Sequence, residues 1–359
     1  MSAVADAVGL EIAMGGEIAI AKRRPYINRR GESVVALPTG RILANGEPEY
    51  REQRIHTNAT LRKDEWIRLD ERLITAARER LVIIEDMRAA GLIAPMGGLG
   101  TLISEWEKVS EMTDAEVTMD GESQTEEDRV AFGLNGVPIP LIQKRFRIGE
   151  RALLASRTRG AGLDVTAGVE AARAVARTSE KMVFNGLQLG ASNSAGETYQ
   201  IYGLTTFPQR ATLAISDWTD EDTTPEEILD DILAMVRVLE TQKRHYGPFN
   251  LYIPGDVAWQ FRRDFKKFGE RTLMQRVQAE ESIAAVRVSD VLETPNVVMV
   301  EMDELTLDLA VASDISNIQW ASGSGWTNFF QTFAAWAPRL KSDYDGNTGI
   351  LHATMTLGT

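Results

Sequence analysis

Two segments of the chain repeat apolar residues at three- and four-residue intervals, the spacing that places side chains on one face of an α-helix. The first predicted helix covers residues 64–90 and ends at Gly91, and its stripe contains Trp66, Leu69, Leu73, Ala77, Leu81 and Ile84. The second covers residues 165–185, where the stripe is built mainly from Val and Ala. Asp164 is its predicted N-cap, and Asn185-Gly186 is a suitable stop.

A third helix has the clearest boundary signals. Thr224-Pro225-Glu226-Glu227 combines an N-cap threonine, a proline at the first helical position and a glutamate three residues after the cap. Gly247-Pro248 ends the segment, and Lys243, Arg244 and His245 precede this end, where cations complement the helix dipole. A strand is expected at 249–253, and a further helix is expected at about 256–268.

Period-two alternation predicts a strand over residues 137–148. Ile142, Phe146 and Ile148 fall on one face, and Gln143, Arg145 and Arg147 fall on the other. Pro138 and Pro140 confine the beginning of this strand to a sheet edge. Further strands are expected at 297–301 and at about 305–311, 315–320, 326–337 and 349–357. Helices and strands in this order predict an α+β fold.

Charge divides the chain unevenly. The net charge is −13, which argues against a protein that binds nucleic acid over its whole surface. Residues 104–128 hold ten acidic residues and one lysine, so we expect this segment to project as the acidic part of a long hairpin that ends with the 137–148 strand. Residues 1–60 show no sustained helix or strand period and suit an extended arm, in which residues 20–45 hold six basic residues against one acid.

Catalytic and metal-binding patterns are weak. The chain has no Cys, and its three His residues, at positions 56, 245 and 352, have no metal-ligand spacing. We therefore expect no catalytic residue, no metal and no cofactor, and we expect the three histidines to have structural roles. No apolar run is long enough for a membrane-spanning helix, and the default expectation is a soluble protein made in the cytoplasm.

The candidate functional residues are charged groups that could join one copy of the chain to another. The acidic set lies in the 104–128 segment, and the basic set lies in the 141–160 segment and in the arm. A solvated acidic tip and a solvated basic tail remain as alternatives. The candidates are Glu105, Glu107, Glu111, Asp114, Glu116, Arg145, Arg147, Arg151, Arg157, Arg159, Arg23, Arg24, Arg29 and Arg30.

The order of these elements resembles the shell-forming proteins of tailed bacteriophages and the related encapsulins, which share the Hong Kong 97 phage capsid fold. Five stretches carry the resemblance. They are Asp64-Glu-Trp-Ile-Arg-Leu-Asp-Glu71, Val137-Pro-Ile-Pro-Leu-Ile142 continuing to Ile148, Leu163-Asp164 through to Val183-Phe-Asn-Gly186, Tyr246-Gly-Pro-Phe-Asn-Leu-Tyr-Ile253 and Phe329-Phe-Gln-Thr-Phe-Ala334.

The resemblance implies a division of the chain. Residues 1–62 would form an extended N-terminal arm, and residues 104–148 would form the extended loop hairpin. Residues 63–103, 149–215 and 315–359 would form the peripheral domain, which contains a spine helix at 165–185. The axial domain would be residues 216–314.

The implied function is a major capsid protein that assembles with itself, as hexamers and pentamers of an icosahedral shell, around double-stranded phage DNA bound by non-specific contacts. The implied location is the virion capsid, assembled in the host bacterial cytoplasm, and the implied further partners are portal, scaffolding and decoration proteins. An encapsulin-like compartment that encloses a cargo enzyme is the alternative from the same fold. An acidic two-domain cytosolic enzyme is a more distant alternative.

Overall fold

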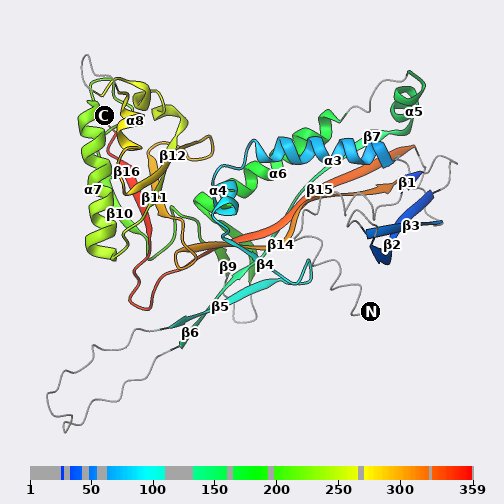
Figure 1. Ribbon diagram of the computed structural model, residues 1–359, viewed down its shortest axis with the longest axis horizontal. Coiled ribbons are helices and arrows are strands. Elements are labelled where there is room, and N and C mark those ends of the chain that lie inside the picture. The colour runs from blue at the N-terminus through cyan, green and yellow to red at the C-terminus, as the bar shows by residue number, and fades with distance from the viewer. Residues whose placement is uncertain are drawn as a thin grey trace, which may run out of the picture.

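The computed structural model describes residues 26–27, 33–42, 48–54, 63–109, 132–159, 165–192, 198–265, 271–322 and 326–357. In these ranges the chain is built from two sheets, each covered by helices, and from three smaller strand groups that extend away from them (Figure 1). None of the described helices is both long enough and apolar enough to cross a membrane.

The first unit is a four-stranded sheet under two helices that lie side by side (Figure 1). Its helices are α3 (Lys63–Arg78) and α6 (Thr166–Asn185), and α4 (Ile83–Ala89) packs beside them. The strands, in spatial order, are β4 (Ile93–Pro95), β14 (Leu307–Ala321), β15 (Thr327–Leu340) and β7 (Leu141–Gly149). The small residues of α6 allow this close packing, because a Cβ added to Gly168 would lie 3.1 Å from both Leu73 of α3 and Phe146 of β7.

The helix expected at 64–90 is divided in two. Residues 79–82 break it, so α3 and α4 are separate elements, and Gly91 follows with a positive φ of 76° as the expected stop. The expectation of one continuous helix was wrong. The apolar spacing continues through the break, because Leu81 in the break and Ile84 in α4 both belong to the same core as the apolar residues of α3.

The spine helix predicted at 165–185 is confirmed as α6. Its predicted cap, Asp164, lies outside the described residues, and Val165 occupies the N-cap position without a side-chain capping bond. The two strands expected at 305–311 and 315–320 form one strand, β14, because irregularities between Val311 and Ser316 interrupt the pairing without ending the strand.

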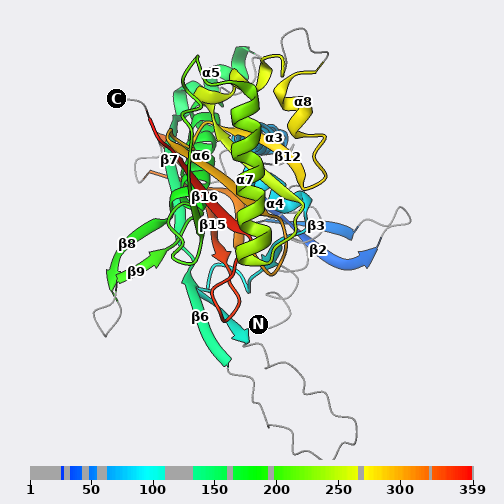
Figure 2. The same cartoon turned by 90° about the vertical axis from the view of Figure 1, so that its left-hand side faces the viewer.

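The second unit is a mixed five-stranded sheet packed against α7 (Pro225–Lys243) and α8 (Leu273–Val277) (Figure 2). Its strands, in spatial order, are β10 (Ala211–Ile215), β16 (Ile350–Met355), β13 (Asn296–Glu301), β11 (Phe249–Pro254) and β12 (Ile283–Ser289). β10 and β16, which the sequence expectation assigned to the peripheral domain, lie in this sheet because β16 pairs with both β10 and β13.

The capping box predicted for the third helix is confirmed: the Thr224 side chain accepts from the backbone N–H of Glu227, and the Glu227 side chain accepts from the backbone N–H of Thr224. The helix expected at 256–268 is not formed. Two 3₁₀ turns, Gly255–Val257 and Gln260–Arg262, replace it. Side chains here bond across the chain instead, since Gln260 donates to the Asp220 carbonyl at 2.6 Å and Arg263 donates to the Thr223 carbonyl at 3.0 Å.

β11 separates two hydrophobic cores. Leu251 and Ile253 belong to the core under α7, whereas Tyr252 belongs to the core under α6. Because successive residues of a strand point to opposite faces, the sheet of the second unit contributes to both cores. The two units therefore share a wall of side chains.

Three strand groups extend from these units. β5 (Ile103–Val109) and β6 (Phe132–Pro138) form a hairpin that leads away from the first sheet (Figure 1). β8 (Leu187–Ser192) pairs with β9 (Thr198–Ile201), and α5 (Glu150–Arg159) follows β7. The strand expected at 137–148 is therefore two strands, β6 and β7, which are separated at Ile139 and Pro140.

The arm contains strands that its sequence pattern did not predict. β1 (Tyr26–Ile27), β2 (Ser33–Ile42) and β3 (Pro48–Arg54) form an antiparallel sheet. The pairing of β2 with β3 is irregular between Pro38 and Ile42, where Pro38 has no N–H to donate and Gly40 weakens the alternation. These interruptions explain why the sequence shows no sustained strand period there.

Candidate subunit-contact surfaces

β7 has the two faces that its alternation predicted. Phe146 points toward α6 and stacks on Phe330 of β15 with a 5.0 Å centroid distance. Arg145 and Arg147 lie on the opposite face and are exposed. The expectation that β7 presents its arginines away from the core is confirmed.

Aromatic and amide side chains support Arg145. The Nε of Arg145 donates to Oε1 of Gln331 at 2.9 Å, and its guanidinium lies 5.5 Å from the centroid of the Trp320 ring. Trp320 stacks on Phe329, which pairs in register with Arg147. Such contacts fix a guanidinium in place while leaving its remaining donors available. We call this surface the basic sheet face; it consists of Arg145, Arg147, Ile318, Trp320, Phe329 and Gln331.

The other basic candidates are distributed more widely. Arg151 is exposed on α5, and the backbones of Arg157 and Arg159 lie further along the same helix. Glu150 begins α5 and accepts from the buried Asn328 side chain at 2.8 Å, which ties the helix to the end of the basic sheet face.

The base of the hairpin also has two faces. Glu105 and Glu107 are exposed, whereas Ser104 and Trp106 face the first sheet. Arg339 of β15 donates to the Ser104 hydroxyl at 3.3 Å and lies 5.9 Å from the centroid of the Trp106 ring. This side of the strand anchors the hairpin, and the acidic side is left for contacts elsewhere.

A buried ion cluster holds Arg339 in place. Asp308, which is 1% exposed, accepts from the Arg339 guanidinium through both carboxylate oxygens and lies 2.8 Å from the Lys341 Nζ. Asp308 and Arg339 are cross-strand partners of β14 and β15. Sequence reasoning did not identify this cluster, because Asp308 is 31 residues from Arg339 and the three residues match no motif spacing.

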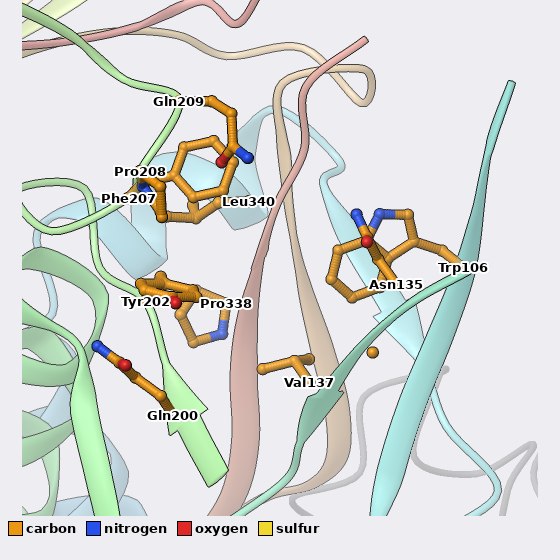
Figure 3. Close-up of a pocket in the computed structure, with 11 residues that line it drawn as sticks. Trp106, Asn135, Val137, Gln200, Tyr202, Phe207, Pro208, Gln209, Pro338 and Leu340 are labelled. Atoms are coloured by element: carbon orange, nitrogen blue, oxygen red, sulfur yellow. The ribbon is translucent and has the colours of Figure 1, made fainter. Parts of the chain in front are cut away.

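A cleft of about 230 Å³ lies between the hairpin base and the connection that follows β9 (Figure 3). Trp106, Asn135 and Val137 form the hairpin side, and the opposite side includes Tyr202, Phe207, Pro208, Pro338 and Leu340. None of the residues that line the cleft is charged.

Both described histidines lie within hydrogen-bond distance of a polar side chain, and His56 lies outside the described residues. Nε2 of His352 lies 2.8 Å from the Asn296 side chain, and burial, with the nearby Arg210 charge, lowers its pKa to about 4. His245 pairs with the Glu301 carboxylate, which also accepts from the Gly247 N–H at 3.1 Å. In the part of the chain that the structure describes, no three His, Asp or Glu side chains are grouped as a metal site would require.

The acidic and basic candidates whose side chains the structure describes do not meet within one chain. Among the described residues, neither Glu105 nor Glu107 forms an ion pair with Arg145, Arg147 or Arg151. The remaining candidates lie outside the described residues; they are Glu111, Asp114, Glu116, Arg23, Arg24, Arg29 and Arg30. Trp320 and Gln331 were missed because the sequence did not show which strand would lie beside β7.

Solved structures with the same arrangement define the class. The virus-like particle of Pyrococcus furiosus aligns with a TM-score of 0.56 and 16% identity over 79% of this chain and 97% of that chain. The capsid of Myoviridae phage XM1 aligns with a TM-score of 0.57 and 10% identity over 76% and 92% of the two chains. The capsid of a native GTA particle aligns with a TM-score of 0.54 and 10% identity over 85% and 95%. The chain therefore has the Hong Kong 97 phage capsid fold, which encapsulins share.

Its family is shown by the sequence itself. Residues 56–353 match the family described as "Family of unknown function (DUF6260)", and the chain belongs to that family. A curated relative is the type 1 encapsulin shell protein EncA of Myxococcus xanthus (strain DK1622). It is 28% identical over 266 residues, which cover 72% of this chain and 83% of the relative.

Proposed function

We propose that this chain is a shell-forming structural protein, the major capsid protein of a tailed bacteriophage, and that many copies close into an icosahedral shell around double-stranded DNA. The observation that carries the proposal is that two surfaces of opposite charge, the acidic hairpin base with Glu105 and Glu107 and the basic sheet face, form no ion pair with each other among the described residues. The relatives named for their role are shell and capsid proteins, which agrees with the expectation of a structural protein rather than an enzyme.

The proposed subunit contact joins the acidic hairpin of one copy to the basic sheet face of a second copy. Glu105 and Glu107 begin the acidic set, which continues along the sequence through Glu111, Asp114 and Glu116. Arg145 and Arg147 are the central receiving groups, with Arg151, Arg157 and Arg159 beside them on α5. Exposed ion pairs contribute only about 0–1 kcal/mol each, so the contact depends on several pairs and on the apolar surface of Ile318 and Trp320.

The parts of the chain have separate proposed roles. The unit under α6 corresponds to a peripheral domain, and the unit under α7 corresponds to an axial domain. The arm, with Arg23, Arg24, Arg29 and Arg30, anchors across a subunit boundary rather than reading a DNA sequence. Hexamers and pentamers of the chain, together with portal, scaffolding and decoration proteins, complete a virion capsid assembled in the host bacterial cytoplasm.

A compartment that encloses a cargo enzyme is the second candidate. The similarity to the encapsulin EncA favours it, since the aligned region covers 83% of that shell protein. The content of purified particles separates the two candidates: nucleic-acid absorbance that resists external nuclease supports the capsid, and a co-purified enzyme without nucleic acid supports the compartment.

The test of the contact is charge reversal with a matched control. Arg145→Glu with Arg147→Glu should abolish closed particles, as seen by size-exclusion chromatography and negative-stain microscopy, and should leave the circular dichroism of the subunit unchanged. Arg177→Glu with Lys181→Glu makes the same change in charge on the exposed face of α6 and should leave assembly intact. Particles formed by the first variant at the normal yield would refute the contact.

A further inference from the structure

A short helix connects the two units of the chain. α4 packs beside α6 in the first unit, and its side chains also reach β11 and β12 of the second unit. Its N-cap residue, Val82, makes no side-chain capping bond, so the first amides of α4 depend on a group from elsewhere.

Glu180 of α6 supplies that group. Its Oε1 accepts from the N–H of Ile84 at 3.2 Å, and its Oε2 lies 3.5 Å from the N–H of Ile83. The residue has no exposed surface. A carboxyl group in this position joins the spine helix to the beginning of α4, and it does so without contact with water.

Asp86 joins the other side of α4 to the second unit. Its Oδ2 accepts from the Tyr252 hydroxyl at 2.8 Å, and its Oδ1 lies 3.2 Å from a guanidinium nitrogen of Arg287. Tyr252 is fully buried, also receives a bond from Asn250 at 3.4 Å, and makes an edge contact with Phe184 of α6 at 5.6 Å. One helical turn therefore contacts α6 of the first unit and two strands, β11 and β12, of the second unit.

The ionisable groups around Glu180 disfavour a negative charge there. Burial, together with the Asp86 charge, raises the pKa of Glu180 from 4.5 to about 8, although the bonds from the α4 amides oppose the shift. From β11, only the Tyr252 phenol faces this carboxyl group, and from β12 Arg287 is paired with Asp86. Lys181, which follows Glu180 in the sequence, points away from the carboxyl group: its side chain is exposed and pairs with Glu293. Arg88 of α4 pairs with Asp314, and Arg80 pairs with Asp290.

We propose that α4 is a proton-controlled latch between the two units: protonated Glu180 keeps the helix closed against α6 and the second sheet, and loss of that proton to solvent releases it. An ionised carboxylate at this position would be a buried charge beside the like charge of Asp86. Movement of α4 away from α6 would admit water and relieve both penalties, and it would also disturb the Tyr252 and Arg287 contacts made by Asp86.

The test is hydrogen exchange of the α4 amides in the full-length protein, corrected for the intrinsic effect of pH. Release of one proton on opening makes the open form about tenfold more populated per pH unit between the pKa values of the open and closed forms. Protection of residues 83–90 should therefore fall about 100-fold between about pH 5.5 and about pH 7.5. Glu180→Gln and Glu180→Met should remove this dependence, and Glu170→Gln, on the exposed face of the same helix, should retain it.

Infrared spectroscopy provides a second measurement that needs no variant to fold. The wild-type protein should show the carbonyl band of a protonated, dehydrated carboxyl group at neutral pH, and the band should titrate away near the raised pKa of Glu180, about 8. Absence of this band, protection that does not change with pH, or an unchanged pH dependence in Glu180→Gln would overturn the proposal. A rise in protection with pH would also overturn it, because the ionised form would then be the one that holds α4.

Discussion

Removing the negative charge of Asp308 should be among the most destabilising conservative changes in the chain. Asp308 is the only carboxylate that pairs with Arg339 and Lys341 among the described residues, and these two cations have side chains only 12% and 17% exposed. Asp308→Asn keeps the size of the side chain and leaves two largely buried cations without a counter-charge. Removing one partner of a buried ion pair costs about 3–5 kcal/mol, so we expect a loss of that size in the free energy of unfolding.

The assay is denaturant-induced unfolding of the full-length protein, with wild type and variants in the same assembly state. Arg339→Met should cost less than Asp308→Asn, because Asp308 then keeps its 2.8 Å contact with Lys341. Asp290→Asn is the control: it removes an ion pair with Arg80 from a side chain that is 73% exposed, and it should cost at most about 1 kcal/mol. An Asp308→Asn protein within 1 kcal/mol of wild type would refute the reasoning.

Three further outcomes follow from packing, capping and ionisation. Gly203→Ala should prevent accumulation of folded protein, because its Cβ would lie 2.2 Å from the backbone nitrogen of Gly186, whereas Gly100→Ala, which meets nothing within 4 Å, should express normally. Thr224→Ala should lower the unfolding free energy by about 1 kcal/mol, and Thr224→Ser should restore it, as measured by thermal denaturation. The pKa of His352 is lowered from 6.5 to about 4 in the folded state, so the unfolded state takes up the proton first as the pH falls. The free energy of unfolding should therefore decrease as pH drops from 6.5 toward 4. His352→Gln should lessen that decrease in acid titrations followed by circular dichroism.

Local signals in the sequence were sufficient for part of the fold. The Thr224 capping box and the small-residue stripe of α6 depend on neighbours within four residues, so their helices could be placed from the sequence alone. The alternation of β7 likewise predicted which side chains face α6 and which face away. Arg145 and Arg147 were identified as candidates for this reason.

The remaining features depend on partners that are distant in the sequence. Trp320 lies beside Arg145 only because β14 and β7 pair with opposite edges of β15. The Glu180 carboxyl group accepts a hydrogen bond from Ile84, which is 96 residues away in the sequence. The segment after Pro254 was expected to be helical. It forms 3₁₀ turns instead, and its side chains are hydrogen-bonded to the 220–223 loop, which is about 40 residues away in the sequence. Sequence periodicity reports which residues are buried, but it does not report which element buries them.

The shared wall formed by β11 has a consequence for how the chain loses its structure. Leu251 and Tyr252 are neighbours in one strand, yet they belong to different cores, so neither core can be exposed without disturbing the residues that complete the other. Two domains joined by a linker would melt as two separate calorimetric transitions. Here the first and second units should unfold in a single cooperative step, and a cavity made at either Leu251 or Tyr252 should lower the melting temperature of the whole molecule rather than of one half.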